Sequence, residues 1–451
     1  MGFVGCSFSS FILFKPGNES VPVPASKQRT GDAKSGYTYL TTGDYLRSGI
    51  PLSYFKMVFG KSSLNYLNRD GVNKEIAYDY TVVAASNGEL VVAPNCMQCH
   101  AQVFDGKLIM GLGNSTIDFT HGEKLDPKNA EAAERILKNL DPNKYEAAEP
   151  FLRVVKGIGN QMRTEVRGVN VADRLAALLA SHRDPKTFRW RDKPLLEVTS
   201  GVIPTDVPAW WMLKKKNAMF YNGFGRGDFG RFLMASNLLT VNDTTESREV
   251  DAHFNDVLAY INSIKPPRYP NPLNKTMVKQ GGILFVQNCS KCHGSYGNDG
   301  KFPNLLIPES EIQTDSALYK SNYQSYQFIE WFNSSWFAQG DHPARLEPFN
   351  GYIAPPLDGV WITAPYLHNG SIPDLESLLN SRERPVYWSR DFDNPEYDYN
   401  KLGWKYKVVT EPGGTTIYNT RLTGYGNYGH YYGDKFNNRE RKAIIEYLKT
   451  L

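Results

Sequence analysis

Apolar residues recur at helical spacing in several stretches of this 451-residue chain. Intervals of three and four residues between apolar side chains are typical of a helix with one buried face. They predict helices over residues 129–139, 172–182, 249–264, 275–287 and 437–451. Runs of apolar and β-branched residues predict short strands over residues 78–84 and 90–92. The pattern therefore predicts a mainly α fold with long irregular loops and a few short strands.

A proline-rich stretch interrupts this pattern at residues 266–273 and predicts a stiff linker. It would separate a first domain, residues 36–265, from a second domain, residues 274–451. Residues 1–35 offer little apolar surface and predict a flexible leader. Its Val-Gly-Cys tripeptide, ending at Cys6, resembles the end of a bacterial lipoprotein signal, which would make this cysteine lipid-bearing; the alternative is an unmodified thiol. No apolar run reaches the roughly 18 residues of a membrane-spanning helix.

Composition narrows the classes of function. A net charge of +4, with 22% charged residues, does not suggest a nucleic-acid-binding protein. Tyrosine (27), phenylalanine (23) and tryptophan (8) are abundant, as are glycine (38) and proline (27). Such a composition suits a loop-rich protein wrapped around large flat cofactors, although an exported protein with many turns would share it.

Two pentads carry the strongest chemical signal. Residues 96–100 read Cys-Met-Gln-Cys-His, and residues 289–293 read Cys-Ser-Lys-Cys-His. This spacing is typical of c-type haem attachment, in which two thiols form thioethers with one porphyrin and the next histidine ligates its iron. A single C-x-x-C could instead belong to a redox dithiol or a zinc site, but the two pentads use four of the five cysteines and leave no further C-x-x-C to complete a zinc tetrahedron. Two covalent haem c groups are therefore predicted, on Cys96, Cys99 and His100 and on Cys289, Cys292 and His293.

The second half carries motifs that resemble a known family. Residues 363–371 read Thr-Ala-Pro-Tyr-Leu-His-Asn-Gly-Ser and are similar to a segment of the bacterial di-haem cytochrome c peroxidase superfamily. Pro-Pro-Leu-Asp-Gly-Val-Trp at residues 355–361 and Gly-His-Tyr-Tyr-Gly at residues 429–433 resemble the branch that contains the di-haem rubber oxygenases. The resemblance covers roughly residues 75–451, and it is more specific in the second domain than in the first. It implies two cytochrome c-like haem domains.

The second iron needs a ligand on its far side, and the ligand type tunes its chemistry. The last methionine of the chain is Met277, before the second pentad, so no later methionine is available. The resemblance implies that His430 is the distal ligand, with His368 and His342 as alternatives. A bis-His haem has a lower reduction potential than a His–Met haem, which makes it a poor entry port for electrons from small cytochromes.

The first haem, on His100, would then be the reactive one. The resemblance implies that Phe220 or Phe224 caps a pocket for peroxide or dioxygen, and that Trp210 or Trp211 bridges toward the second haem. His121, His182, His253 or a methionine could instead close this iron and make it an electron carrier.

The resemblance also implies a calcium ion between the domains. Its ligands would be the carbonyls of Thr363 and Pro365 with the amide of Asn114, and such hard oxygen ligands suit calcium. The alternative is a rigid proline turn without an ion.

These observations lead to an exported oxidoreductase, on the periplasmic or extracellular side of a bacterial cell. Three hypotheses remain: a peroxidase fed by a small electron-donor protein, an oxygenase acting on an apolar alkene, and a non-enzymatic electron-transfer cytochrome. No nucleic-acid partner is expected, and a membrane would be reached only through a lipid on Cys6.

Overall fold

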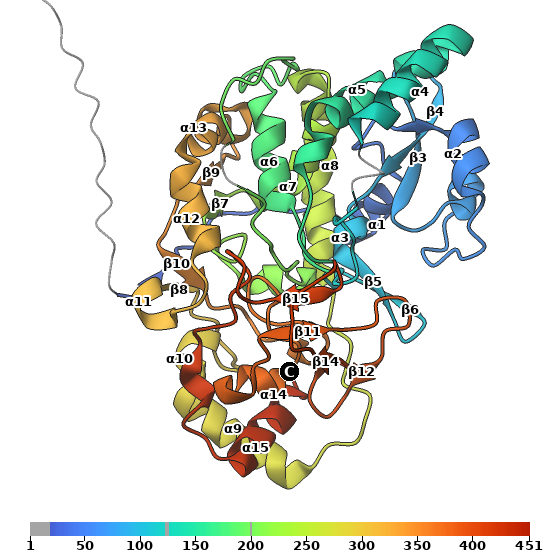
Figure 1. The fold of residues 1–451 in the computed structure, drawn as a ribbon. Coiled ribbons are helices and arrows are strands. Elements are labelled where there is room, and N and C mark those ends of the chain that lie inside the picture. The colour runs from blue at the N-terminus through green and yellow to red at the C-terminus, as the bar shows by residue number, and fades with distance from the viewer. Residues whose placement is uncertain (1–18, 122–125, 199–200) are drawn as a thin grey trace, which may run out of the picture.

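The computed structural model describes residues 19–121, 126–198 and 201–451, and it combines helices with several small sheets (Figure 1). The structure is 41% helical and 13% strand, so the expectation of a mainly α fold is confirmed only in part: helices predominate, but the fold is mixed. The strand pairs recorded in the described residues are antiparallel, and most strands have only two to five residues. Some of these short strands pair with residues more than 100 positions away in the chain, which the periodicity of one segment does not reveal.

The first half of the chain builds most of the upper lobe in Figure 1. Its helical elements are α1 (Ala33–Thr42), α2 (Leu52–Phe59), η1 (Gly71–Glu75), α3 (Met97–His100), α4 (Pro127–Leu140), α5 (Pro142–Ile158), η3 (Gly159–Gln161), α6 (Ala172–Ser181), η4 (Trp210–Lys215), α7 (Phe229–Leu233), η5 (Met234–Leu239) and α8 (Thr244–Ser263). Its strands are β1 (Val21–Pro22), β2 (Ile50–Pro51), β3 (Tyr80–Ala84), β4 (Leu90–Pro94), β5 (Ala101–Phe104), β6 (Lys107–Met110) and β7 (Gly225–Gly227).

The second half builds the lower lobe and also contributes to the upper one. Its helical elements are α9 (Lys275–Asn288), α10 (Ser290–His293), α11 (Glu309–Ile312), α12 (Ala317–Gln324), α13 (Tyr326–Ser334), η6 (Trp336–Ala338), η7 (Val360–Ile362), α14 (Leu375–Leu378), η8 (Ser381–Glu383), η9 (Tyr431–Gly433) and α15 (Asn438–Leu448). Its strands are β8 (Leu305–Pro308), β9 (Ala344–Leu346), β10 (Gly351–Ile353), β11 (Tyr387–Ser389), β12 (Tyr397–Asp398), β13 (Gly403–Trp404), β14 (Lys407–Val408) and β15 (Ile417–Asn419).

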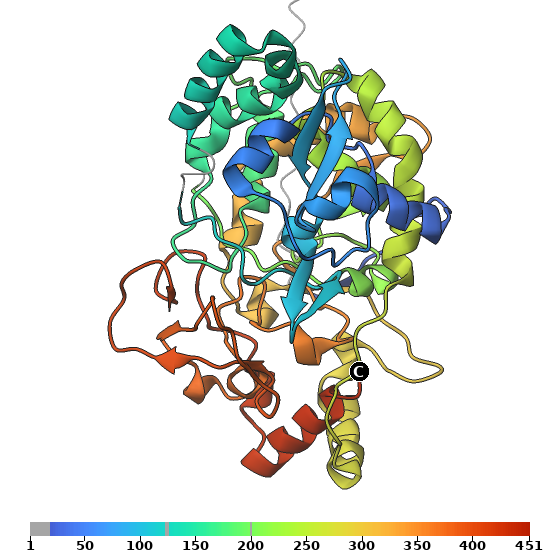
Figure 2. The ribbon, with the colours of Figure 1, turned by 90° about the vertical axis from the view of Figure 1, so that its right-hand side faces the viewer.

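The helices predicted from periodicity are confirmed as α4, α6, α8, α9 and α15, and the two predicted strands as β3 and β4. Their ends follow from capping chemistry. The side chain of Asn274 accepts a hydrogen bond from the backbone of Met277 at 3.1 Å and starts α9. Asn437 and Glu440 form a reciprocal capping box at the start of α15. These two helices pack across each other at the foot of the molecule (Figure 2).

Part of the expected leader is packed against the rest of the chain. Residues 1–18, which include Cys6, lie outside the described residues, but residues 19–35 are not a flexible leader. Val21 pairs with Leu306 in the β1–β8 ladder. Arg29 is bound to Asp228 at 2.8 Å and to Asp251 at 2.7 Å, and these side chains are largely buried. Backbone pairing and a buried ion-pair network thus hold a segment that offers few apolar side chains.

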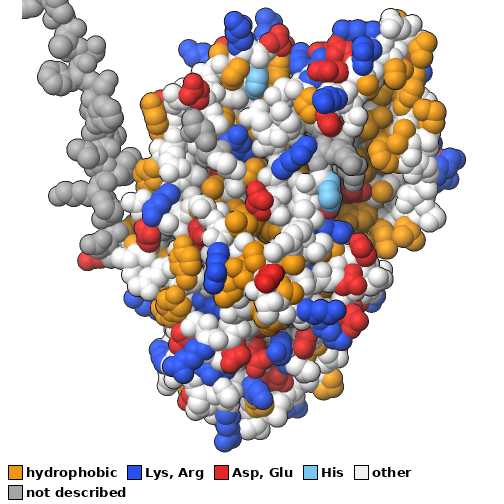
Figure 3. All heavy atoms as spheres, viewed as in Figure 1, with side chains coloured by type: hydrophobic (Ala, Val, Ile, Leu, Met, Phe, Trp, Pro, Cys, Tyr) orange, Lys and Arg blue, Asp and Glu red, His pale blue; other side chains and the backbone are white. Residues whose placement is uncertain are grey.

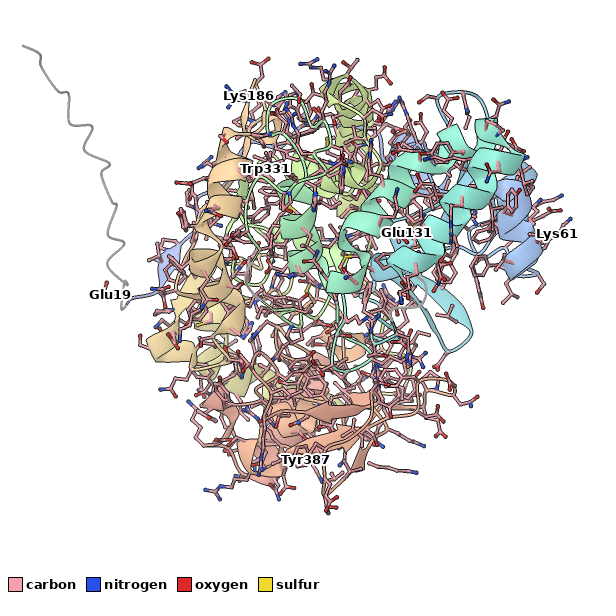
Figure 4. All side chains as sticks on the ribbon, turned by 45° about the horizontal axis from the view of Figure 1, so that its top comes forward. Glu19, Lys61, Glu131, Lys186, Trp331 and Tyr387 are labelled. Carbon is pink, nitrogen blue, oxygen red and sulfur yellow. The ribbon has the colours of Figure 1, made fainter. Side chains whose placement is uncertain are left out.

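The two halves interlace around a shared interior. Strand β7 pairs with β9, so residues 225–227 and 344–346 form one small sheet. The indole nitrogen of Trp331, on α13, donates to the carbonyl of Arg183 at 2.6 Å, and Figure 4 shows this tryptophan in the upper lobe. Segments on both sides of the proline-rich linker therefore contribute to the core of the upper lobe.

Acidic and basic side chains are interspersed on the face shown in Figure 3, in keeping with the small net charge. Among the residues that the structure describes, no helix is both long and apolar enough to cross a membrane.

Candidate haem-binding cavity

Each pentad is a single helical turn. The backbone nitrogen of His100 donates to the carbonyl of Cys96 at 3.0 Å, and that of His293 donates to Cys289 at 3.0 Å. Residues three and four apart share one face of a helix. The two thiols and the imidazole of each pentad can therefore reach the same space, and none of these four cysteines is paired in a disulfide.

Both pentads line one large cavity. Its volume is about 1050 Å³, and its wall includes the cysteines and histidines of both motifs. Single small-molecule sites usually occupy roughly 300–1,000 Å³. A cavity of this size, bordered by two attachment motifs and lined mainly by apolar side chains, fits large flat cofactors.

His100 is held by an aromatic neighbour. Its ring stacks on Trp210 at a centroid distance of 4.6 Å and an interplanar angle of 18°. Burial lowers the pKa of His100 to about 3, so the imidazole is neutral near pH 7 and its nitrogen lone pair is available to a metal. In the described part of the chain, its Nδ1 is buried and makes no hydrogen bond.

His293 has a different environment. Its Nδ1 lies 2.9 Å from the carbonyl oxygen of Pro355, an arrangement that leaves Nε2 for a metal. The His430 ring lies 6.1 Å from it, centroid to centroid. Two imidazoles that share one metal ion, each bound at about 2 Å, have centroids about 6 Å apart. The spacing of this pair therefore fits an iron between the rings.

His430 lies in a loop with an uncommon backbone conformation. His430 has φ +49° and follows Gly429 at φ +82°. A Cβ on Gly429 would lie 2.3 Å from the backbone nitrogen of Thr314, so only glycine fits there. The guanidinium of Arg384 donates to the carbonyls of Asn427 at 2.8 Å and Gly429 at 2.7 Å. Burial, followed by the charges of His293 and Arg384, lowers the pKa of His430 to about 3.

The two alternative ligands of the second iron are placed differently. His368 lines the cavity, but its ring stacks on Tyr352 at 4.2 Å, and its Nε2 lies 3.1 Å from the Tyr352 hydroxyl. His342 is exposed and is not part of the cavity wall. Of these three histidines, His430 has a ring contact with His293.

The two tryptophans link the environments of the pentad histidines. Trp210 stacks on His100, and the indole nitrogen of the neighbouring Trp211 donates to the carbonyl of Asp358 at 2.8 Å. Asp358 is three residues along the chain from Pro355, which accepts from His293. A path of packed rings, backbone and hydrogen bonds thus connects the two histidines.

Phe220 and Phe224 both line the cavity, with ring centroids 5.2 Å apart. Phe224 is buried, whereas Phe220 keeps 41% of its surface exposed and has φ +66°. The aromatic wall continues through Phe232, which stacks on Phe332 at 5.1 Å. This part of the cavity is therefore strongly apolar.

The residues expected to bind calcium, Asn114, Thr363 and Pro365, also line the cavity. The Asn114 side chain is already engaged: its nitrogen donates to the carbonyl of Gln98 at 2.7 Å, and its oxygen accepts from Thr116. No cluster of three or more histidine, cysteine, aspartate or glutamate side chains in the described residues could hold a metal ion. A calcium site would therefore depend on backbone carbonyls.

Several polar residues of the cavity wall were not predicted from the sequence. Asp173, Asp206 and Lys216 line it, and burial raises the pKa of Asp173 to about 6 and lowers that of Lys216 to about 8. Each stands alone in its local sequence, without a motif around it. Only the fold brings them to the cavity.

Comparison with known proteins adds one assignment. Residues 351–389 match the family model described as RoxA-like, cytochrome c-like. This segment contains Pro355, His368 and Arg384, which surround the second pentad and the His430 loop. The match indicates a haem cytochrome with covalently bound haem c.

Two curated relatives from Sinorhizobium fredii (strain NBRC 101917 / NGR234) are also similar. Uncharacterized protein y4iM is 28% identical over 309 residues, which cover 59% of this chain and 68% of that protein. Uncharacterized protein y4iJ is 40% identical over 253 residues, covering 42% of this chain and 41% of that protein. The chain thus matches about two thirds of one relative and two fifths of the other, and neither name states an activity.

Proposed function

We propose that this chain is an exported di-haem c-type cytochrome that activates peroxide or dioxygen at the haem on His100. The haem on His293 would be six-coordinate, with His430 as its second ligand. The observation that carries the proposal is an asymmetry. His293 faces a second imidazole at 6.1 Å, whereas the ring contact recorded for His100 is with Trp210.

Bound haem would supply an iron that exchanges one electron and that binds a small oxygen-containing molecule where its sixth position is open. The chain supplies the surroundings. Burial keeps His100 neutral and able to ligate, and Trp210 fixes the plane of its ring. The apolar wall around Phe224 and Phe232 keeps water away from this region and strengthens electrostatic interactions inside it.

The second haem would act as an electron reservoir and tuning site. Two histidine ligands give a haem a lower potential than a histidine and a methionine. Trp210 and Trp211, with the hydrogen bond from Trp211 to Asp358, provide a route between the two haem environments. This arrangement favours internal electron sharing over direct entry from a high-potential donor.

Between the two enzymatic hypotheses, the cavity wall favours the oxygenase acting on an apolar alkene. The cavity wall includes the rings of Phe220, Phe224 and Phe332. Because Phe220 is partly exposed, this apolar surface extends to the exterior of the protein. Such a wall binds apolar molecules well and offers little to a small polar substrate. A peroxidase supplied by a small electron-donor protein remains the second enzymatic hypothesis.

One observation favours a non-enzymatic electron-transfer cytochrome. Met162, Met212 and Met219 line the cavity, and so does His121. Methionine and histidine are the usual sixth ligands of electron-transfer haems. A methionine or histidine on the far side of the first iron would leave no open position for oxygen or peroxide.

Export, a lipid on Cys6 and calcium between the halves complete the proposal. Thioether attachment of haem takes place outside the cytoplasm, and this supports a periplasmic or extracellular location. Carbonyl oxygens of Thr363 and Pro365 would supply hard ligands for calcium.

Electron paramagnetic resonance of the oxidised protein tests the proposal. We expect one high-spin haem and one low-spin haem in the wild type, because only the second iron would have six strong ligands. His430→Ala should convert the low-spin signal to high-spin, whereas His342→Ala, at an exposed histidine outside the cavity, should leave both signals unchanged. Two low-spin signals in the wild type would contradict the catalytic proposal and leave the electron-transfer function.

Turnover separates the two enzymatic hypotheses. Oxygen-dependent cleavage products from a polyisoprenoid, together with an oxygen-sensitive spectrum, would support the oxygenase. Peroxide reduction coupled to oxidation of a small reduced cytochrome would support the peroxidase. A spectrum that neither dioxygen nor carbon monoxide changes would argue against both.

A further inference from the structure

A carboxyl group outside the attachment motifs, that of Asp206, stands in the wall of the cavity. Asp206 lines the cavity, and its backbone nitrogen donates to the carbonyl of His368 at 2.8 Å. It precedes Trp210, the neighbour of His100, by four residues. The same aspartate is thus fixed to the segment around His368, which belongs to the second half.

The Asp206 side chain has one strong hydrogen-bond donor. The hydroxyl of Tyr221 donates to its Oδ2 at 2.6 Å. Tyr221 is itself fixed, because its carbonyl accepts from the backbone of Ile353 at 2.8 Å. Asp206 forms no salt bridge within the described residues, and the cation whose charge acts on its carboxyl is Arg390.

The groups that face this carboxyl set its protonation. Burial raises the pKa of Asp206 to about 7, and the Tyr221 hydroxyl, the Val207 backbone and the Arg390 charge oppose this rise. Tyr418, on β15, also lies within electrostatic range. Arg390 is buried against the rings of Phe392 and Trp404, and its pKa is lowered to about 9, so it stays charged near neutrality.

We propose that Asp206, backed by Tyr221, is the proton-exchanging group of the cavity, which takes up one proton when a haem there gains an electron and releases it when the electron leaves. This inference rests on the proposed function, because it requires bound haem. One electron comes from a small reduced electron-donor protein, which is oxidised by one electron. One proton comes from a hydronium ion of the solvent, whose O–H bond breaks as the carboxylate becomes a carboxylic acid. The only bond formed is the O–H bond, and oxidation breaks it again.

The physical reason is charge balance. An added electron places a negative charge in a region of low dielectric, where a second negative charge nearby is costly. A carboxyl group whose pKa lies near the ambient pH can remove its own charge at little cost. Solvent can deliver the proton, because the exposed residues His121 and Asp118 line the same cavity.

The structural alternative is a carboxylate that only accepts the Tyr221 hydrogen bond. An asparagine oxygen in its place would accept the same hydrogen bond without a titratable group. Asp206→Asn therefore separates the two roles: the contact with Tyr221 remains and the proton site is lost.

The experiment is a spectroelectrochemical titration of the full-length two-haem protein on both sides of neutral pH. In the wild type, the reduction potential of at least one haem should fall as the pH rises. The slope should correspond to one proton per electron, in the pH range between the pKa of the carboxyl in the oxidised protein and its pKa in the reduced protein. Asp206→Asn should abolish this dependence, and Asp206→Glu should retain it. Tyr221→Phe removes a hydrogen bond that lowers the pKa of Asp206, so the pH range in which the haem potential changes should move to higher pH.

Asp374→Asn is the control, because Asp374 is a buried carboxyl that does not line the cavity and that caps α14, a role that asparagine fills equally well. It should keep the wild-type dependence. Infrared redox-difference spectra of the wild type should contain a carboxylic-acid carbonyl band that grows on reduction. An unchanged pH dependence in Asp206→Asn, loss of the dependence in Asp374→Asn, or absence of this band would overturn the proposal. Loss of covalent haem from the wild type would instead refute the proposed function.

Discussion

At the residue scale, each pentad should bind its own haem. The two thiols of a motif lie on one helical turn and face the shared cavity, so one motif does not need the other for its thioethers. We expect Cys96→Ala/Cys99→Ala and Cys289→Ala/Cys292→Ala each to lose half of the covalent haem. The two double variants are controls for each other.

The measurement is haem staining after denaturing electrophoresis, with the intact mass of each variant. The mass should fall by one haem in either double variant. A variant that still carries two haems would contradict the assignment of its pentad. Loss of both haems from one double variant would mean that the second attachment requires the first.

Residues of the site could be predicted from the sequence where their chemistry is local. Cys289, Cys292 and His293 lie within a span of five residues, and one helical turn assembles them. Arg384 and Asp206 have no such signature, because their partners lie elsewhere in the chain. Arg384 meets the carbonyl of Gly429, 45 residues away, and its role follows only from the fold.

At the element scale, the crossing of α9 and α15 depends on a glycine. A Cβ on Gly281 would lie 1.8 Å from the carbonyl oxygen of Ala443, which is closer than two non-bonded heavy atoms can approach. We expect Gly281→Ala to lower the free energy of unfolding by roughly 1–3 kcal/mol or more, because the helices must separate. Chemical denaturation monitored by circular dichroism measures this change.

The neighbouring glycine is the matched control. A Cβ on Gly282 would lie 3.3 Å from the ring of Tyr447, a contact that a small shift of this side chain relieves. In a helix interior, alanine is more favourable than glycine by about 1 kcal/mol. Gly282→Ala should therefore be neutral or stabilising, and equal destabilisation by both variants would contradict a special role for Gly281.

Elements with strong periodicity and local caps could be predicted, and others could not. Asn274 and Asn437 mark the starts of α9 and α15 within one residue. Helix α5 contains Pro150, and proline usually ends a helix, so its sequence argues against the helix that forms. Strand β1 has two residues and pairs with β8, almost 300 residues away, which no local pattern indicates.

At the scale of the whole molecule, the proline-rich linker marks a change in the chain but not a division of the core. Trp331, Phe332 and Phe337 follow the linker, yet they pack in the core of the upper lobe with residues that precede it. Trp211 precedes the linker and packs in the core of the lower lobe. Both halves also contribute to the wall of the large cavity. We therefore expect reduction of either haem to change the reduction potential of the other.

This interlacing predicts that the two halves stay together when the linker is cut. Residues 270–272 are exposed, so a protease site introduced there should be cleavable in the folded protein. The two pieces should co-elute in size-exclusion chromatography, because the β7–β9 and β1–β8 ladders and the hydrogen bond from Trp331 to Arg183 join them. They should separate only in denaturant.

The uncut variant with the same insertion is the control for any effect of the protease site itself. Cleaved and uncut samples should keep the same haem spectra, because the cavity wall contains residues from both pieces and stays closed while they remain associated. Elution of two separate haem-bearing fragments under native conditions would contradict a shared core. It would also mean that the two haems interact only across a weak interface. The proton uptake proposed for Asp206 would then accompany reduction of the haem in one half only.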